Sequence, residues 1–278
     1  MTRTYRTDIV DVFAETRLAG NQLAVVHDAG SLSETEMQAI ALETNFSETT
    51  FVLSRGGGRA TVRIFTPAWE LPFAGHPTIG TAWVLTEGEG EIILDLPVGP
   101  VEVFIRDGVA WMTPPEVTFS GTPDVTEVAA LVGLESDDLA TDWPVELASV
   151  GPDFVLVPVK DLATLKRARL NAEHHVRLLS DGVGVQCVFL FCDQPYSADA
   201  DFSARMFFES GGIREDPATG SANTAFAAYL RKHRGNIGNV VVEQGMEINR
   251  PSRLYLFVED SLQVGGKVQP VFRGELSL

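Results

Sequence analysis

The sequence contains little cysteine and no long hydrophobic run. Its 278 residues include two cysteines, Cys187 and Cys192, whose spacing matches neither a Cys-x-x-Cys redox motif nor a set of metal ligands. We therefore interpret both as buried, reduced thiols. No apolar stretch approaches the length of a membrane span, and the polar N-terminus is not followed by the apolar segment of a signal peptide. These features predict a cytoplasmic protein that has no membrane partner.

Positive charge is also scarce. The 38 Asp and Glu residues outnumber the 21 Lys and Arg residues, so the formal net charge at pH 7 is −17. Nucleic acids and anionic membranes are both bound by basic surfaces, so neither is an expected partner. An anionic substrate would have to be held by local features, such as helix N-termini or single arginines.

Several catalytic motifs are missing as well. The chain has no His-Glu-x-x-His, no Gly-x-Ser-x-Gly, and no Gly-x-Gly-x-x-Gly after a predicted strand. These absences argue against a zinc hydrolase, a serine hydrolase of the nucleophile-elbow type and a dinucleotide-binding fold. We expect no metal site.

A buried helix is predicted to begin at Asp216. Asp is a strong N-cap, and Pro217 suits the first helical position. The residues that follow are apolar or small on every face, and the helix ends in cations and Gly235. A helix that is apolar all round is buried on all sides, and its N-terminus is a natural anion site.

The same pattern occurs earlier in the chain. Residues 76–82, which begin with His76 and Pro77, align without gaps with residues 216–222, and Pro, Gly and Ala match. The offset, 216 − 76 = 140, is close to half the chain length. A predicted strand that carries Phe precedes each copy, at residues 63–65 and 205–207. These similarities predict an internal duplication.

Short strands separated by turns make up most of the remaining chain, with a further helix predicted from residue 162 to about 179 and a strand over residues 183–192. Residues 113–115 (Thr-Pro-Pro) break the pattern, so we predict domains over residues 1–115 and 116–278 and leave open whether the final strand returns to the first domain. The predicted class is α+β. Each domain is a barrel-like mixed sheet wrapped round its apolar helix, and both helix N-termini face a shared cleft.

Three side chains are candidates for moving a proton, because a general base must reach the C–H bond that it breaks. His76 and Asp216 lie at the two predicted helix starts. Glu48 begins a strand between apolar neighbours, and burial there would favour its neutral form. Each also has an ordinary interpretation: Asp216 as a simple cap, His76 as a structural residue and Glu48 as a solvated residue.

Three segments resemble the signatures of the PhzF-like phenazine-biosynthesis family. They are residues 45–51 (Asn-Phe-Ser-Glu-Thr-Thr-Phe), 74–80 (Ala-Gly-His-Pro-Thr-Ile-Gly) and 215–222 (Glu-Asp-Pro-Ala-Thr-Gly-Ser-Ala). The resemblance covers the whole chain and implies two pseudo-symmetric domains, similar in fold to diaminopimelate epimerase. It also implies an isomerase that acts without metal or organic cofactor, since the characterised member isomerises trans-2,3-dihydro-3-hydroxyanthranilate in this way.

The resemblance also implies roles for individual residues. It places the proton shuttle on Glu48, and contacts with the substrate and the proton network on His76, Asp216 and Ser221. The expected substrate is a small carboxylate, and the expected assembly is a homodimer. The epimerase relatives use two cysteines at comparable helix starts, where this chain has His76 and Asp216, so two-thiol chemistry is disfavoured here. The residues expected to bind the substrate are Gly75, Gly220, Ser221 and Ala222.

Two departures from the family pattern leave the substrate open. The family often has Pro where this chain has Gln22, and Gly where it has Asn249. Two other functions also stay open: a binding protein that keeps the site without turnover, and an epimerase of an amino or hydroxy acid.

Overall fold

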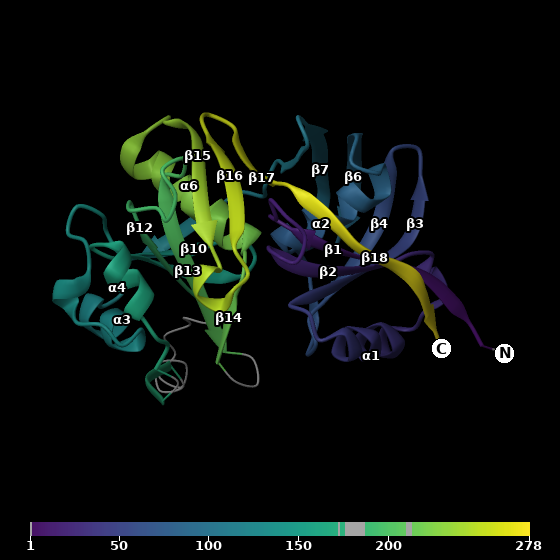
Figure 1. Ribbon diagram of the computed structural model, residues 1–278, viewed down its shortest axis with the longest axis horizontal. Helices are drawn as coiled ribbons and strands as arrows, with labels where there is room; N and C mark the ends of the chain where they lie inside the picture. Colours follow the sequence, from purple (N-terminus) through teal and green to yellow (C-terminus); the bar gives the residue numbers. More distant parts are fainter. Residues whose placement is uncertain (1, 172, 176–186, 210–212) are drawn as a thin grey trace. The chain divides into compact units, whose positions relative to one another are not determined.

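A computed structural model describes residues 2–171, 173–175, 187–209 and 213–278. The chain is a mixed α+β protein in which strands predominate, and it divides into two units (Figure 1). The first unit contains Met1–Pro114 and Gln263–Leu278, and the second contains Pro115–Leu262. The last strand therefore belongs to the first unit. No helix in the described part of the chain is long and apolar enough to cross a membrane.

The first unit is a mixed sheet with two helices. The sheet pairs β1 with β2, β2 with β3, β3 with β4, β4 with β5 and β6, β6 with β7, and β7 with β8. The β2–β3 and β4–β6 pairs are parallel and the others antiparallel, and β18 pairs with the outer edge of β1. The elements are β1 (Thr4–Val12), β2 (Asn21–Val26), α1 (Glu34–Thr44), β3 (Glu48–Gly56), β4 (Arg59–Phe65), β5 (Glu70–Leu71), α2 (Gly75–Thr86), β6 (Gly90–Leu96), β7 (Gly99–Arg106), β8 (Val109–Met112) and β18 (Val268–Ser277).

The second unit repeats this order of pairing. Strand β10 pairs with β9 and β11, β11 with β12, β12 with β13, β13 with β14 and β15, and β15 with β16, with β11–β12 and β13–β15 parallel. Strand β17 (Leu262–Gly266) follows β16, but its residues from Gln263 onward belong to the first unit, where it pairs with β8. The other elements are β9 (Thr118–Gly121), α3 (Val125–Leu131), β10 (Glu146–Ser149), β11 (Asp153–Pro158), α4 (Leu162–Arg167), β12 (Cys187–Cys192), β13 (Phe202–Glu209), β14 (Ile213–Asp216), α6 (Gly220–Arg234), β15 (Gly238–Gln244) and β16 (Ser252–Val258).

Two predicted elements extend into parts of the chain that are not described. The helix predicted from residue 162 is α4, which ends at Arg167, and residues 172 and 176–179 of the predicted span lie outside the described residues. The strand predicted over residues 183–192 is described from Cys187 onward, as β12.

One helix in each unit is buried among strands. Helix α2 contacts β1, β2, β3, β6, β7 and β8 (Figure 1). Gly80 allows this approach, because a Cβ there would lie 2.6 Å from both Leu23 and Val12. Helix α6 is buried from Gly220 to Leu230. Its Phe226 ring lies 4.5 Å from the ring of Phe191 on β12, centroid to centroid.

Both helix starts differ from the predicted ones. Helix α6 begins at Gly220, with Thr219 as its N-cap, because Asp216 still pairs with Met206 in the β13–β14 ladder. Helix α2 begins at Gly75, which makes His76 the second helical residue and not a cap.

The predicted alignment of the repeat was also wrong by five residues. In α2 the amide of Thr78 donates to the carbonyl of Ala74, and in α6 the amide of Asn223 donates to that of Thr219. The first turns therefore correspond at an offset of 220 − 75 = 145. His76 corresponds to Ser221, not to Asp216. The sequence alignment was wrong because the Pro-x-x-Gly motif lies within α2 in the first unit, whereas in the second it leads into α6 and ends at the first helical residue.

A bidentate ion pair precedes the central helix in both units. Arg63 on β4 bonds Glu70 on β5 through Nε–Oε1 (2.7 Å) and Nη2–Oε2 (2.5 Å). Arg205 on β13 bonds Glu215 on β14 through the same atoms at 2.9 and 2.6 Å. The Arg205 side chain is only 3% exposed, against 24% for Arg63. Its Nη1 also donates to the carbonyls of Leu165, Lys166 and Ala168.

The difference in burial predicts different costs for the same substitution. Arg205→Met should lower the free energy of unfolding by about 3–5 kcal/mol, because Glu215 would remain buried without its partner. Arg63→Met should cost about 1 kcal/mol or less, since its pair is partly solvated. Urea unfolding of both variants measures the difference, and equal costs would contradict this account of the burial.

Candidate active site

Two parallel strands and a helix bring Asn21, Glu48 and His76 together in the first unit. Asn21 begins β2 and Glu48 begins β3, and the ladder pairs Leu23 with Glu48. His76 follows the first residue of α2, and its Nδ1 lies 3.4 Å from Glu48 Oε2 and 3.3 Å from Asn21 Nδ2. The side chain of His76 is 4% exposed and that of Glu48 15%. The strand starts and the helix start therefore form one largely buried polar cluster.

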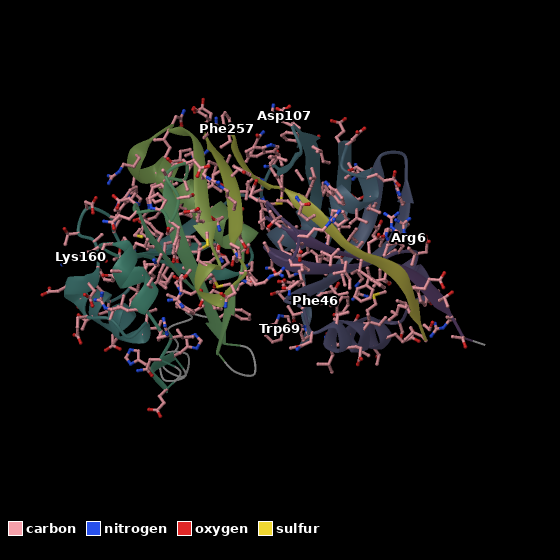
Figure 2. The ribbon with its side chains drawn as sticks, viewed as in Figure 1. Arg6, Phe46, Trp69, Asp107, Lys160 and Phe257 are labelled. Atoms are coloured by element: carbon pink, nitrogen blue, oxygen red, sulfur yellow. The ribbon has the colours of Figure 1, made fainter. Side chains whose placement is uncertain are left out.

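A sharp turn delivers Glu48 to this position. Helix α1 ends at Asn45, which takes the left-handed conformation (φ 51°) that Asn tolerates better than most residues. Phe46, labelled in Figure 2, and Ser47 then lead into β3. The segment that resembled a family signature is thus a helix stop followed by a strand start.

The His76 imidazole is neutral. Burial lowers its pKa to about 3, although a hydrogen bond to the backbone of Gln22 opposes the shift. Its contact with Glu48 is therefore not an ion pair. The other ring nitrogen, Nε2, is buried and has no hydrogen-bond partner among the described residues. A buried polar atom without a partner costs about 1–3 kcal/mol, so this nitrogen is a good candidate to bind a polar ligand atom.

A second polar cluster surrounds the start of α6. Asp216 Oδ2 accepts a hydrogen bond from Thr219 Oγ1 at 2.6 Å. Gln244, the last residue of β15, donates from Nε2 to the Asp216 carbonyl (2.9 Å) and to Thr219 Oγ1 (3.0 Å). Its Oε1 accepts from Thr219 N (3.3 Å) and Asn223 Nδ2 (3.1 Å). All four of these residues are buried.

The two clusters occupy different positions of the repeated unit. Glu48 is the first residue of β3 and Cys187 is the first described residue of β12, and the two strands hold the same place in their ladders. A thiol therefore stands where the first unit has its carboxylate. In the ladders, Phe65 pairs with Glu70 and Phe207 with Glu215, so Asp216 corresponds to Leu71. By the same comparison Thr219 corresponds to Ala74, and Gln244, which ends β15, corresponds to Leu96, which ends β6. The acidic and amide side chains of the second cluster thus have apolar counterparts in the first unit, whereas Glu48 and His76 have a thiol and a hydroxyl as counterparts in the second.

Neither central helix has a side-chain cap. Ala74 precedes α2 and Thr219 precedes α6, and neither side chain accepts a hydrogen bond from the first turn of its helix. Amides of a first turn bind anions well, and the helix dipole adds to the attraction. The predicted binding residues lie in these turns: Gly75 in α2, and Gly220, Ser221 and Ala222 in α6.

Asn21, Thr219 and Gln244 were not predicted as site residues. The sequence did offer one signal, since Gly20 stands beside Asn21 and Gly245 beside Gln244. Gly245 (φ 78°) packs so closely on the loop before α6 that a Cβ would lie 2.5 Å from the Pro217 carbonyl oxygen. Among the described residues, no group of three or more His, Cys, Asp or Glu side chains is arranged to hold a metal ion.

Comparison with known proteins identifies the family. Residues 10–274 match the family model described as phenazine biosynthesis-like protein (PhzC-PhzF). The chain belongs to the PhzF family. The predicted resemblance is thereby confirmed over nearly the whole sequence.

Relatives of known name extend this result. An uncharacterized isomerase of Mesorhizobium japonicum is 34% identical over 302 residues, covering 99% of each chain. The trans-2,3-dihydro-3-hydroxyanthranilate isomerase of Pseudomonas aeruginosa is 35% identical over 265 residues, covering 92% of this chain and 91% of that one. The crystal structure of a Bacillus anthracis PhzF-family phenazine biosynthesis protein superposes with a TM-score of 0.87 at 28% identity, covering 99% of both chains. These names confirm the expected isomerase class.

A more distant structure shares the fold alone. A hydroxyproline epimerase of Agrobacterium vitis superposes with a TM-score of 0.65 at 13% identity, covering 99% of this chain and 93% of that one. The PhzF-family chain thus has the fold of proteins that include epimerases.

The buried, neutral His76 predicts a loss of stability in acid. Its pKa is about 3 in the folded protein against an ordinary value of 6.5, so below pH 6.5 the unfolded chain binds a proton that the folded protein does not. Stability is therefore complete above pH 6.5 and falls as the pH decreases. Between pH 7 and pH 5 this group alone should cost about 2 kcal/mol.

Urea unfolding of the wild type and of His76→Gln at both pH values isolates this contribution. The wild type should lose about 2 kcal/mol more than the variant on acidification. Equal losses would mean that the His76 ring is protonated as readily in the folded protein as in the unfolded chain.

Proposed function

We propose that this PhzF-family isomerase moves a proton between two carbons of a small cyclic or unsaturated carboxylate, with Glu48 as the base. The reaction is similar to that named for the trans-2,3-dihydro-3-hydroxyanthranilate isomerase relatives. The observation that carries the proposal is the Glu48–His76 cluster. In it a carboxylate, only 15% exposed, lies 3.4 Å from a neutral imidazole whose second nitrogen has no partner in the described structure.

The neutral state of His76 suits this chemistry. An imidazolium beside Glu48 would stabilise the carboxylate as an ion pair and make it a weaker base. A neutral ring leaves the basicity of Glu48 largely intact and can still exchange hydrogen bonds through Nε2. In this proposal Glu48 removes a proton from one carbon and returns it to another, while His76 contacts the substrate.

The helix starts can stabilise negative charge. Removing a proton next to an unsaturated system leaves an enolate-like anion, and the first turn of α2 lies beside Glu48 with its positive dipole end. For the second unit we propose a holding role. The amides of Gly220, Ser221 and Ala222 would bind the substrate carboxylate, and Asp216 would accept or donate a hydrogen bond.

The difference between the two units favours one base over two. An epimerase that works with two bases needs a proton-accepting group on each face of its substrate. Here the second unit has Ser221 and Cys187 where the first has His76 and Glu48. This supports the isomerase over the epimerase, while a binding protein without turnover remains the second candidate, because the uncapped helix starts would serve it equally well.

Two structural expectations accompany the proposal. The finer fold assignment is a pair of pseudo-symmetric, diaminopimelate epimerase-like domains, each a barrel-like sheet round its central helix. The matching ladder orders support it. The homodimer, the small carboxylate substrate and the independence from metals and organic cofactors also stay predictions.

Replacing Glu48 should abolish turnover and leave the fold intact. Glu48→Gln keeps the shape of the side chain but removes its basicity, so we expect the rate to fall about 10³-fold or more. The assay follows carboxylates, including trans-2,3-dihydro-3-hydroxyanthranilate, in D₂O by proton NMR and records exchange of C–H hydrogens and isomerisation.

Cys187→Ser is the matched control, because Cys187 occupies the corresponding position in the second unit and should be replaceable without loss of rate. If Glu48→Gln retained the wild-type rate, Glu48 would not be the base. If a carboxylate bound tightly to the wild type without any exchange of its C–H hydrogens, the binding-protein function would be favoured.

A further inference from the structure

The Gln244 side chain is hydrogen-bonded through both atoms of its amide next to Asp216. It is fully buried, and its amide group makes four hydrogen bonds, two as donor and two as acceptor. Rotating the amide by 180° would place its oxygen against the Asp216 carbonyl and its NH₂ against the Thr219 amide. Both contacts would be repulsive, so the orientation is fixed by its partners.

This orientation bears on the direction of the hydrogen bond between the Thr219 hydroxyl and Asp216. Gln244 Nε2 already donates to Thr219 Oγ1, so that oxygen accepts one hydrogen bond. The single hydroxyl proton of Thr219 is then directed to Asp216 Oδ2, 2.6 Å away. In the ionised carboxyl, Oδ2 is thereby held as the acceptor of this hydrogen bond.

The fold does not require this arrangement. In the first unit the corresponding residues are Leu71, Ala74 and Leu96, which cannot form the chain of hydrogen bonds. A central helix begins there all the same, with the same backbone bond from its fourth residue to its N-cap. The polar residues of the second unit therefore serve something other than starting the helix.

We infer that Gln244 is a positioning residue that acts through Thr219 to orient the Asp216 carboxyl. It holds the Thr219 hydroxyl as a donor to Oδ2 and so favours the ionised form of the Asp216 carboxyl. The inference deepens the proposed function, since it rests on Asp216 contacting the substrate. The chain of hydrogen bonds itself can be tested without a substrate.

The test is a pH titration of the Asp216 carboxyl carbon in protein labelled with ¹³C at the aspartate side chain, with the signal assigned by Asp216→Asn. Thr219→Val keeps the side-chain shape but removes the donor, so the carboxylate loses a charge-assisted hydrogen bond. Its titration midpoint should move to higher pH, with about a tenfold gain in proton affinity. Thr219→Ser restores the donor and should return the midpoint to the wild-type value.

Gln244→Leu introduces the residue of the first unit and frees the Thr219 hydroxyl to turn away. It should also move the midpoint to higher pH, by no more than Thr219→Val. If Gln244→Leu does not fold, Gln244→Met takes its place, and an unchanged midpoint in the folded Gln244 variant would overturn the inference. A purely structural role would lower the stability of Thr219→Val to urea and leave the midpoint unchanged, and that result would overturn the inference. Because no turnover is involved, this outcome is distinct from a failure of Glu48→Gln to lose activity.

Discussion

The structure depends on burying the start of a helix inside a β-sheet unit. Hydrophobic packing favours a helix that is apolar on all sides, but the amides of its first turn and the polar groups that deliver the chain to it must then be bonded within the protein. In both units a bidentate Arg–Glu pair, Arg63–Glu70 or Arg205–Glu215, joins the two strands before the helix. What remains at the helix start is a small polar region with amides facing it, and this is where the chemistry can be placed.

The polar region at the helix start contains different residues in the two units. The first has a carboxylate and an imidazole, Glu48 and His76, on two elements whose starts coincide. The second has a carboxylate oriented by its own hydrogen-bond chain, Asp216, Thr219 and Gln244. Because the positions are not equivalent, we do not expect them to act as the two matched bases of a symmetric racemase. One copy has a carboxylate beside an imidazole and the other a carboxylate bonded by Thr219; in our proposal the first carboxylate is the base.

Sequence reasoning predicted the α+β class and the two buried helices, because apolar periodicity is a local property. The roles of Glu48, His76 and Asp216 stay predictions. Sequence reasoning was wrong about the start of α6, because pairing between strands decides where that helix begins. The ladder pairing of Asp216 with Met206 holds that residue in a strand and delays the helix to Gly220, which no local pattern of Asp and Pro reveals. Asn21, Thr219 and Gln244 were missed for the same reason, since Asn21 bonds His76, 55 residues away, and Gln244 bonds Thr219, 25 residues away. The cleft expected to receive both helix starts stays a prediction.

The central claim is that a single buried base carries the proton. It is tested most directly by a single turnover in ordinary water of the carboxylate found to react, deuterated at the carbon that loses its hydrogen. If Glu48 returns the same proton, a measurable fraction of the product should carry deuterium at the new carbon. Product whose new C–H hydrogen comes entirely from solvent, with a separate group as donor, would contradict the one-base account.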